Sequence, residues 1–161
     1  QTPYRATPEK AAWFKDKMYA EFGNCKNKPV DWCLGLAVVK DPETGYLGVH
    51  QSAYMDFMVE RFGLQDASPA DTPLPPDMKI NKGDRCTDTR LSDSLKTEFQ
   101  QLLGCICYVA CWTQPQLAYA ASALGAVASA PGPNHLKYAR QVIRYCKGHR
   151  FLGLKYGPPQ T

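Results

Sequence analysis

Thiols and one imidazole are the residues of this sequence whose spacing could make a metal site. Cys105, Cys107 and Cys111 lie close together, and Cys146 and His149 follow in a C-x-x-H arrangement. Ligands of these types can hold zinc, but the paired C-x-x-C spacing of structural zinc sites is absent. The odd total of seven cysteines also fits no even disulfide framework. We therefore expect reduced, mostly buried thiols and no metal site in this chain.

Paired carboxylates, which would hold divalent metal for phosphoryl transfer, are also missing. No Asp-Asp occurs, and the acidic residues are scattered over expected turns and helix surfaces. The sequence therefore predicts no catalytic residue and no cofactor in this chain.

Basic residues offer a different chemistry, the binding of a polyanion. Residues 1–98 hold 13 Lys and Arg and 15 Asp and Glu, whereas residues 99–161 hold six Lys and Arg and no acid. A helix is expected from an Asn134 cap to Gly148, with Leu136, Ala139, Val142, Ile143 and Cys146 facing inward. Its outer side carries a basic stripe, which consists of Lys137, Arg140, Arg144 and Lys147. The stripe could hold phosphates, or it could be a solvated face.

The stretch from Ser94 to Trp112 predicts another helix with two unlike faces. One arc is apolar and is expected to dock on a core: Leu95, Phe99, Leu102, Leu103, Ile106, Val109 and Ala110. The opposite arc has no charge: Thr97, Gln100, Gln101, Gly104, Tyr108 and Cys111. Gly104 costs the helix roughly 1 kcal/mol relative to Ala, which suggests a partner that approaches closely. The alternative is a second packing surface against another helix.

The remaining elements predict an α+β fold. Thr7-Pro8 begins a helix that buries Ala11, Phe14, Met18 and Phe22 and ends at Gly23. Trp32–Val39 is expected to be one strand buried on both faces, returning after the Asp41–Gly45 turn through 46–51. Ser52 caps a short helix that ends at Gly63, and Thr113 with Gln116 form a capping box for a helix at 117–130. That last run of 14 residues is too short to span a membrane.

Taken in order, these elements and their motifs resemble the polymerase region of copia-like LTR retrotransposon Pol polyproteins. The matching residues include Leu34-Gly35-Leu36, Gln51 with Tyr54, Phe62-Gly63-Leu64, Thr72-Pro73, Leu103-Gly104 with Tyr108, Thr113-Gln114-Pro115-Gln116, Arg144-Tyr145, and Gly153-Leu154. The sequence departs from the family pattern at His50 (Ser), Gln114 (Arg), Gln116 (Asp) and His149 (Thr). The family's Tyr-x-Asp-Asp turn and its ribonuclease H acids would lie before and after this chain.

The resemblance implies four segments: 1–64, a palm-tail helix, grip hairpin and short helix; 65–91, an extended Pro-rich linker; 92–150, a three-helix thumb or connection; and 151–161, a strand leading out toward ribonuclease H. By the same resemblance, Trp32 and Gly35 would position the primer end, and Gly104 and Tyr108 would lie against the minor groove. The basic stripe would hold phosphates without reading sequence.

The implied partners are an RNA–DNA or DNA duplex and the neighbouring palm, fingers and ribonuclease H of a parent polyprotein, with no membrane. The full-length enzyme would use a divalent metal, Mg. Its expected location is inside the cell, in the cytoplasm, the nucleus or retroelement particles. No secretory signal is expected. The chain would grip primer–template without catalysing by itself. The alternative is a non-enzymatic protein-interaction module derived from a retroelement.

Overall fold

A computed structural model describes residues 7–23, 31–76, 78 and 91–157 of the chain. The chain forms two compact units, Gln1–Val30 and Asp31–Thr161, which are taken separately below. None of the helices in the described ranges is long and apolar enough to cross a membrane.

The first unit contains helix α1 (Pro8–Phe22). Its predicted ends are confirmed: Thr7 Oγ1 accepts a hydrogen bond from the Lys10 N–H at 3.4 Å, and Gly23, at φ 67°, closes the last turn. The predicted burial is wrong, because no residue of α1 is buried and Phe14 and Phe22 are 58% and 67% exposed. Among the described residues of the first unit there is no second helix or strand on which these side chains could pack.

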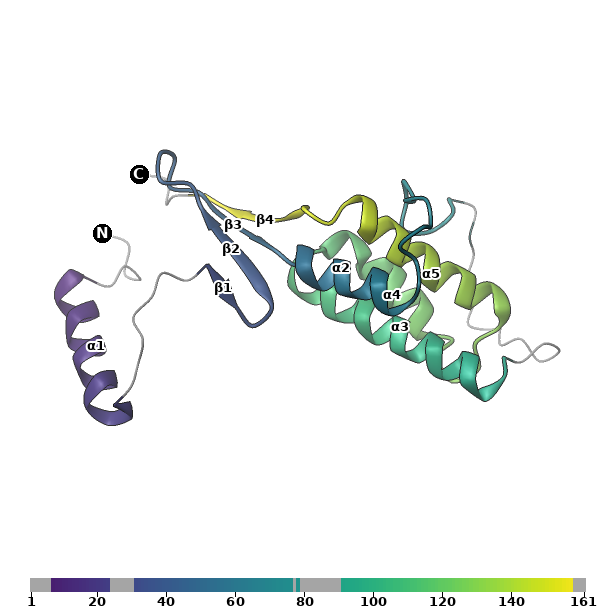
Figure 1. Cartoon of the computed structure of the whole chain (residues 1–161), viewed down its shortest axis with the longest axis horizontal. Coiled ribbons are helices and arrows are strands. Elements are labelled where there is room, and N and C mark those ends of the chain that lie inside the picture. Colours follow the sequence, from purple (N-terminus) through teal and green to yellow (C-terminus); the bar gives the residue numbers. More distant parts are fainter. Residues whose placement is uncertain (1–6, 24–30, 77, 79–90, 158–161) are drawn as a thin grey trace. The chain divides into compact units, whose positions relative to one another are not determined.

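The second unit contains an antiparallel sheet of four strands in the order β1-β2-β3-β4 (Figure 1). The strands are β1 (Trp32–Cys33), β2 (Leu36–Lys40), β3 (Leu47–His50) and β4 (Gly153–Tyr156). All of their residues are half-buried or exposed. The confirmed fold class is α+β, as the sequence indicates.

The expected single strand at 32–39 is wrong. Cys33 pairs with Leu36, so Leu34 and Gly35 form a two-residue hairpin turn between β1 and β2. Both turn residues have positive φ, 52° and 80°, the combination required by a type I′ turn. The apolar run hides this turn because Leu is an unusual residue at positive φ.

The last strand, β4, does not lead out of the unit but returns to β3, with Val49 opposite Leu154 and His50 opposite Gly153. A Cβ at position 153 would lie 2.2 Å from the Val49 carbonyl oxygen, so this pairing needs glycine. The strand predicted at the end of the chain is therefore present, but it completes the sheet.

The helices of the second unit share one core. They are α2 (Ser52–Arg61), α3 (Asp93–Trp112), a 3-10 turn η1 (Pro115–Leu117), α4 (Ala118–Gly125) and α5 (Pro133–Gly148). Met55 and Met58 of α2 belong to the same buried cluster as Phe99 of α3 and Ile143 of α5. The division expected at 65–91 is therefore not a boundary between two lobes, because the helix before it packs with the helices after it. The chain divides before Asp31 instead.

The described part of the 65–91 segment contains turns and bends but no helix or strand, and it packs along α5. The Ala70 N–H donates to the Arg144 carbonyl at 3.3 Å, and Leu74 is buried. A Cβ at Gly148 would lie 3.1 Å from Pro69 Cβ, which shows how closely the segment approaches the helix. Positions 77 and 79–90 of the predicted linker lie outside the described residues.

Three predicted helix caps are wrong. Ser52 is the first residue of α2, and the N-cap of this helix is Gln51. Thr113 does not cap η1, because its hydroxyl donates to buried Gln51 Oε1 at 2.8 Å. Asn134 lies inside α5, whose N-cap is Gly132; the Gly132 N–H donates to His135 Nδ1 at 2.9 Å. The Thr113 hydroxyl is bonded to Gln51, and at the start of α5 the Gly132 N–H is bonded to the His135 ring, so neither of these two expected caps forms.

Candidate nucleic-acid interface

The buried face of α3 is rotated from the predicted one. Phe99, Leu102, Cys105, Ile106 and Val109 are buried, whereas Leu95 is 37% exposed. Leu103 and Ala110 are half-buried. The rotation follows from the packing of α3 on α5 and α4. Cys105 was missed as a core residue, because a reading for metal ligands hides its use as a small apolar side chain.

The uncharged arc of α3, which we name the α3 strip, stays largely exposed to solvent. Five of its residues are exposed (Thr97, Gln100, Gln101, Gly104 and Cys111), and Tyr108 is half-buried. A Cβ added at Gly104 would meet no described atom within 4 Å. No packing within the described residues therefore explains the glycine, and at this position the strip is not a surface for another helix.

The β1–β2 turn sits on Tyr108. The Tyr108 hydroxyl donates to the Leu34 carbonyl at 3.0 Å, and a Cβ at Gly35 would lie 3.2 Å from the Tyr108 oxygen. The Tyr108 ring meets the Tyr54 ring edge-on at 4.7 Å and the Trp112 ring at 6.5 Å. The group that approaches Gly35 closely is therefore a side-chain hydroxyl.

Exposed apolar side chains surround this contact. Trp32 is 53% exposed, Leu34 75% and Trp112 46%. We name the area the turn–α3 surface; it consists of Trp32, Leu34, Gly35, Gly104, Tyr108 and Trp112. Leu34 and Trp112 were missed as site residues. A Leu-Gly pair at the centre of a short apolar run was the available signal for Leu34.

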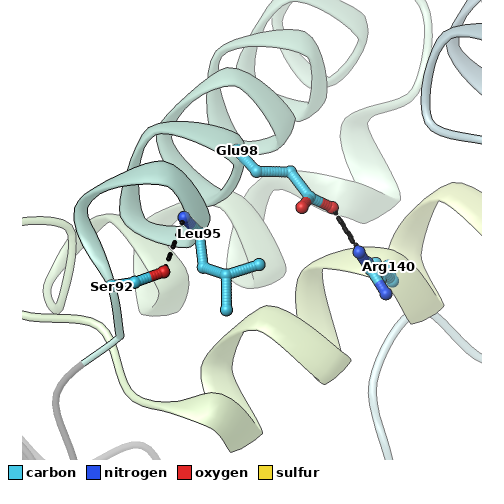
Figure 2. A network of polar contacts seen from close by, with 4 residues as sticks. All are labelled: Ser92, Leu95, Glu98 and Arg140. Carbon is cyan, nitrogen blue, oxygen red and sulfur yellow. Dashed lines mark hydrogen bonds and ion pairs between the residues drawn. The ribbon is translucent and has the colours of Figure 1, made fainter.

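Three of the four cations of the basic stripe are bonded to neighbouring groups. Arg140 pairs with Glu98 of α3 at 2.6 Å, and Figure 2 shows the two side chains meeting between the helices. Arg144 Nε donates to the Ser68 carbonyl at 2.6 Å, and Lys147 donates to the carbonyls of Gln65 and Ala67. Lys137 is exposed and makes no hydrogen bond or ion pair within the described ranges.

An open groove of about 320 Å³ runs beside three of these cations, lined also by Leu64, Pro133, Leu136 and Gln141. The cations in it are Lys137, Arg140 and Arg144. Among the described residues, no hydrogen bond or ion pair joins the basic stripe to the turn–α3 surface. The structure thus places Gly35 against Tyr108, with Gly104 one helical turn before Tyr108 and Trp32 on the strand that enters the turn, and it gathers the four cations as a separate set.

A buried polar network connects the sheet to the helices. Gln51 and Thr113 bond to each other, and Gln114 Nε2 donates to the Leu152 carbonyl at 2.5 Å and its Oε1 accepts from Gln116. Gln51, Thr113 and Gln114 are at most 1% exposed. Gln114 stands where the resembled family has Arg, so an amide here makes the link to the last strand.

Burial shifts the pKa values of two thiols and one phenol in the helices of the second unit. Burial raises the pKa of the Cys146 thiol to about 12 and raises the pKa of Cys107. Burial, followed by the nearby Cys105 thiol, raises the pKa of the Tyr54 phenol. In the described part of the chain, no three His, Cys, Asp or Glu side chains gather where they could hold a metal ion.

Comparison with known proteins points to plant transposons. The chain is 26% identical over 122 residues (74% of its length) to the retrovirus-related Pol polyprotein from transposon TNT 1-94 of Nicotiana tabacum. It is 27% identical over 133 residues (83% of its length) to that from transposon RE1 of Arabidopsis thaliana. An uncharacterized mitochondrial protein of Arabidopsis thaliana is 27% identical over 126 residues, or 78% of this chain.

The chain spans 9% and 8% of the two polyproteins and 49% of the mitochondrial protein. No known protein family and no solved structure matches it. The similarities support an origin in a retrotransposon Pol polyprotein.

Proposed function

We propose that this chain is a piece of the reverse transcriptase region of a copia-like Pol polyprotein and grips primer–template duplex through backbone contacts. The β1–β2 hairpin is the grip, with Trp32 and Gly35 at the primer end. Helix α3 is the first thumb helix, with Gly104 and Tyr108 against the minor groove. The neighbouring palm, fingers and ribonuclease H would belong to the parent polyprotein.

The observation that carries the proposal is the hydrogen bond from Tyr108 to the Leu34 carbonyl. The turn and α3 are 74 residues apart at this contact, yet four residues that the resemblance assigns to one nucleic-acid surface lie around it. An uncharged ridge with a bare Gly104 suits close approach to a groove, since no side chain there keeps the partner away.

The basic stripe would add binding affinity that does not depend on the nucleic-acid sequence. Phosphate contacts from Lys and Arg release counterions, so affinity falls as salt rises. Lys137 is the side chain best placed to do this, because it has no partner within the described residues. This binding would take place inside the cell, in the cytoplasm, the nucleus or retroelement particles.

The chain would not catalyse by itself. Phosphoryl transfer in the resembled enzymes needs paired aspartates around divalent metal, and this sequence has no Asp-Asp. The residues present do not fit such a metal, so its ligands would be supplied by another part of the parent polyprotein.

The test is the affinity of the full chain for a labelled RNA–DNA hybrid, measured by fluorescence anisotropy over a salt series. Gly104→Leu adds a side chain to the ridge at a position where a Cβ meets no described atom within 4 Å, and Gly125→Leu is the matched control because the same holds there. We expect the first to weaken binding about tenfold, which is about 1.4 kcal/mol, and the second to leave it unchanged. Both should keep or raise helix stability.

A second pair of variants tests the stripe. Lys137→Gln should reduce the slope of log affinity against log salt by about 0.9, whereas Lys40→Gln on β2 should not. Should Gly104→Leu bind the hybrid as tightly as the parent, the α3 strip is not a duplex surface. Should the parent chain show no salt-dependent binding at all, the retained alternative, a protein-interaction module of retroelement origin, takes its place.

A further inference from the structure

One face of the sheet carries a hollow that neither the turn–α3 surface nor the basic stripe uses. Strand alternation and register place Val39, Gly48 and Lys155 in one row across β2, β3 and β4. His50 and Gly153 lie in the next row on the same face. With Phe151 and Tyr46 at its ends, this face encloses an open hollow of about 320 Å³.

Two glycines, Gly48 and Gly153, leave part of the floor of the hollow without side chains, for two different reasons. At Gly153 the pairing itself demands glycine, since a Cβ would lie 2.2 Å from the Val49 oxygen. At Gly48 it does not: a Cβ would meet the Val39 carbonyl oxygen at 3.7 Å, an ordinary contact, and the backbone is not left-handed. Glycine weakens a strand, so the bare floor at Gly48 has no explanation in the sheet alone.

The walls combine aromatic rings with cations. Phe151 is 69% exposed and meets the His50 ring edge-on at 6.1 Å, with the Arg150 guanidinium 4.9 Å from its centroid. At the other end, Lys155 Nζ lies 4.0 Å from the centre of the Tyr46 ring. His50 Nδ1 accepts from the Ser52 N–H at 3.4 Å, which leaves Nε2 to carry the proton of the neutral ring.

The carboxylate in the lining, Asp41, is committed to its own turn. It accepts hydrogen bonds from the Thr44 hydroxyl and from the Glu43 and Thr44 amides. These bonds, that from the hydroxyl foremost, hold the pKa of Asp41 below its ordinary value. The remaining groups of the walls are aromatic rings and cationic donors, which suit a ligand that has a flat aromatic ring and a negative charge.

We propose that this hollow binds one unpaired nucleotide, with its base stacked on Phe151 above the Gly48 floor and its phosphate at Lys155. The proposal rests on the proposed nucleic-acid function and extends it from the duplex to a single strand next to it. Base–aromatic stacking tolerates any sequence, which matches a hollow with few fixed hydrogen-bonding groups.

The test compares hybrids with and without a single-stranded overhang, using the full chain. Phe151→Ala should weaken overhang binding by about 5- to 150-fold, the range for loss of one stacked base, and leave blunt hybrid unaffected. Lys155→Gln should weaken it and flatten its salt dependence. Tyr156→Ala and Lys40→Gln, which share the opposite face of the same sheet, are the matched controls.

Gly48→Val separates loss of the site from loss of the fold. Its Cβ fits, a β-branched residue favours a strand, and its methyl groups fill the floor. We expect overhang binding to fall as with Phe151→Ala while thermal stability is kept or raised. Equal losses in the two control variants would overturn the assignment of the face.

Titration with adenosine monophosphate gives a readout that does not depend on the duplex. The backbone amide resonances of positions 48 and 153 should shift in the parent, whereas the corresponding resonances of Gly48→Val should not. If they shift although blunt hybrid does not bind, the duplex proposal fails and the hollow remains a nucleotide site. If neither the nucleotide nor the overhang has an effect, the hollow is not a nucleotide site, whatever the duplex does; a protein contact would give this result.

Discussion

Removal of the Tyr108 hydroxyl tests whether the β1–β2 turn is held to α3. Tyr108→Phe deletes the 3.0 Å hydrogen bond to the Leu34 carbonyl and keeps the ring contacts. A neutral hydrogen bond contributes about 0.5–1.5 kcal/mol net. Because the turn is exposed, water can replace the lost donor at the carbonyl. We therefore expect the lower half of that range, a fall of about 0.5–1 kcal/mol in the free energy of unfolding.

Gly35→Ala makes the prediction sharper. Its own cost has two parts: a left-handed backbone at φ 80°, about 1–2 kcal/mol for a residue with a Cβ, and a Cβ only 3.2 Å from the Tyr108 oxygen. In the Tyr108→Phe background the second part disappears, since the oxygen is gone. The double variant should therefore be more stable than the sum of the single losses predicts, by about 0.5–1 kcal/mol.

The assay is urea denaturation of the parent, the two single variants and the double variant. Tyr119→Phe is the control, because Tyr119 is 68% exposed and makes no hydrogen bond among the described residues. It should leave the unfolding midpoint unchanged. Strict additivity of the two changes would mean that Gly35 and Tyr108 do not touch in solution, and the turn–α3 surface would then lose its basis.

Three further changes probe the core and the sheet. Thr113→Val should lower the free energy of unfolding by about 1–3 kcal/mol, because the buried Gln51 Oε1 loses its hydrogen-bond donor. Thr113→Ser keeps the donor and should be nearly neutral; urea denaturation measures both. Since burial raises the pKa of Cys146 to about 12 from 9.0, the unfolded chain loses the thiol proton first as pH rises. This stability is fully present below about pH 9 and should be lost between about pH 9 and 12, by up to about 1.4 kcal/mol per pH unit, relative to Cys146→Ala at each pH. Gly153→Ala should disrupt the β3–β4 pairing, seen as fast amide exchange in both strands, because no shift of a side chain can relieve a 2.2 Å contact with backbone.

Long periodic helices were predictable from the sequence. All five residues expected to face inward on α5 are buried, from Leu136 to Cys146. The reason is that a 16-residue helix repeats its apolar spacing often enough to fix the face. On α3 the same reasoning selected Leu95, which lies within the arc but in the first turn of the helix, and it missed Cys105, which lies at the edge of the arc and is buried.

Short and non-local features were not predictable. The turn at Leu34–Gly35 interrupts an apolar run without any polar residue, so the period gives no sign of it. The return of β4 to β3 joins residues about a hundred positions apart, and no local pattern encodes such a pairing. The loss of the expected cap at Thr113 has the same origin, since Gln51 reaches Thr113 from 62 residues away.

The basic stripe shows how this limit bears on function. Periodicity places four cations on one face of α5. Three of them are bonded to groups outside this helix, namely Glu98 and the carbonyls at 65–68. A carbonyl takes a hydrogen bond and leaves the charge, and Arg and Lys keep further donors for phosphate. Only the Glu98 carboxylate cancels charge, so Arg140 should contribute least to duplex binding.

Glu98→Gln therefore should strengthen binding of the RNA–DNA hybrid. It releases Arg140 and should steepen the slope of log affinity against log salt by up to about 0.9, one added phosphate contact. The ion pair is partly exposed, with side-chain exposures of 44% and 26%, so the change should cost at most about 1 kcal/mol of stability. Glu60→Gln, an exposed acid on α2, is the control for the general loss of one negative charge. An equal gain in both variants would show that net charge, rather than the stripe, attracts the duplex.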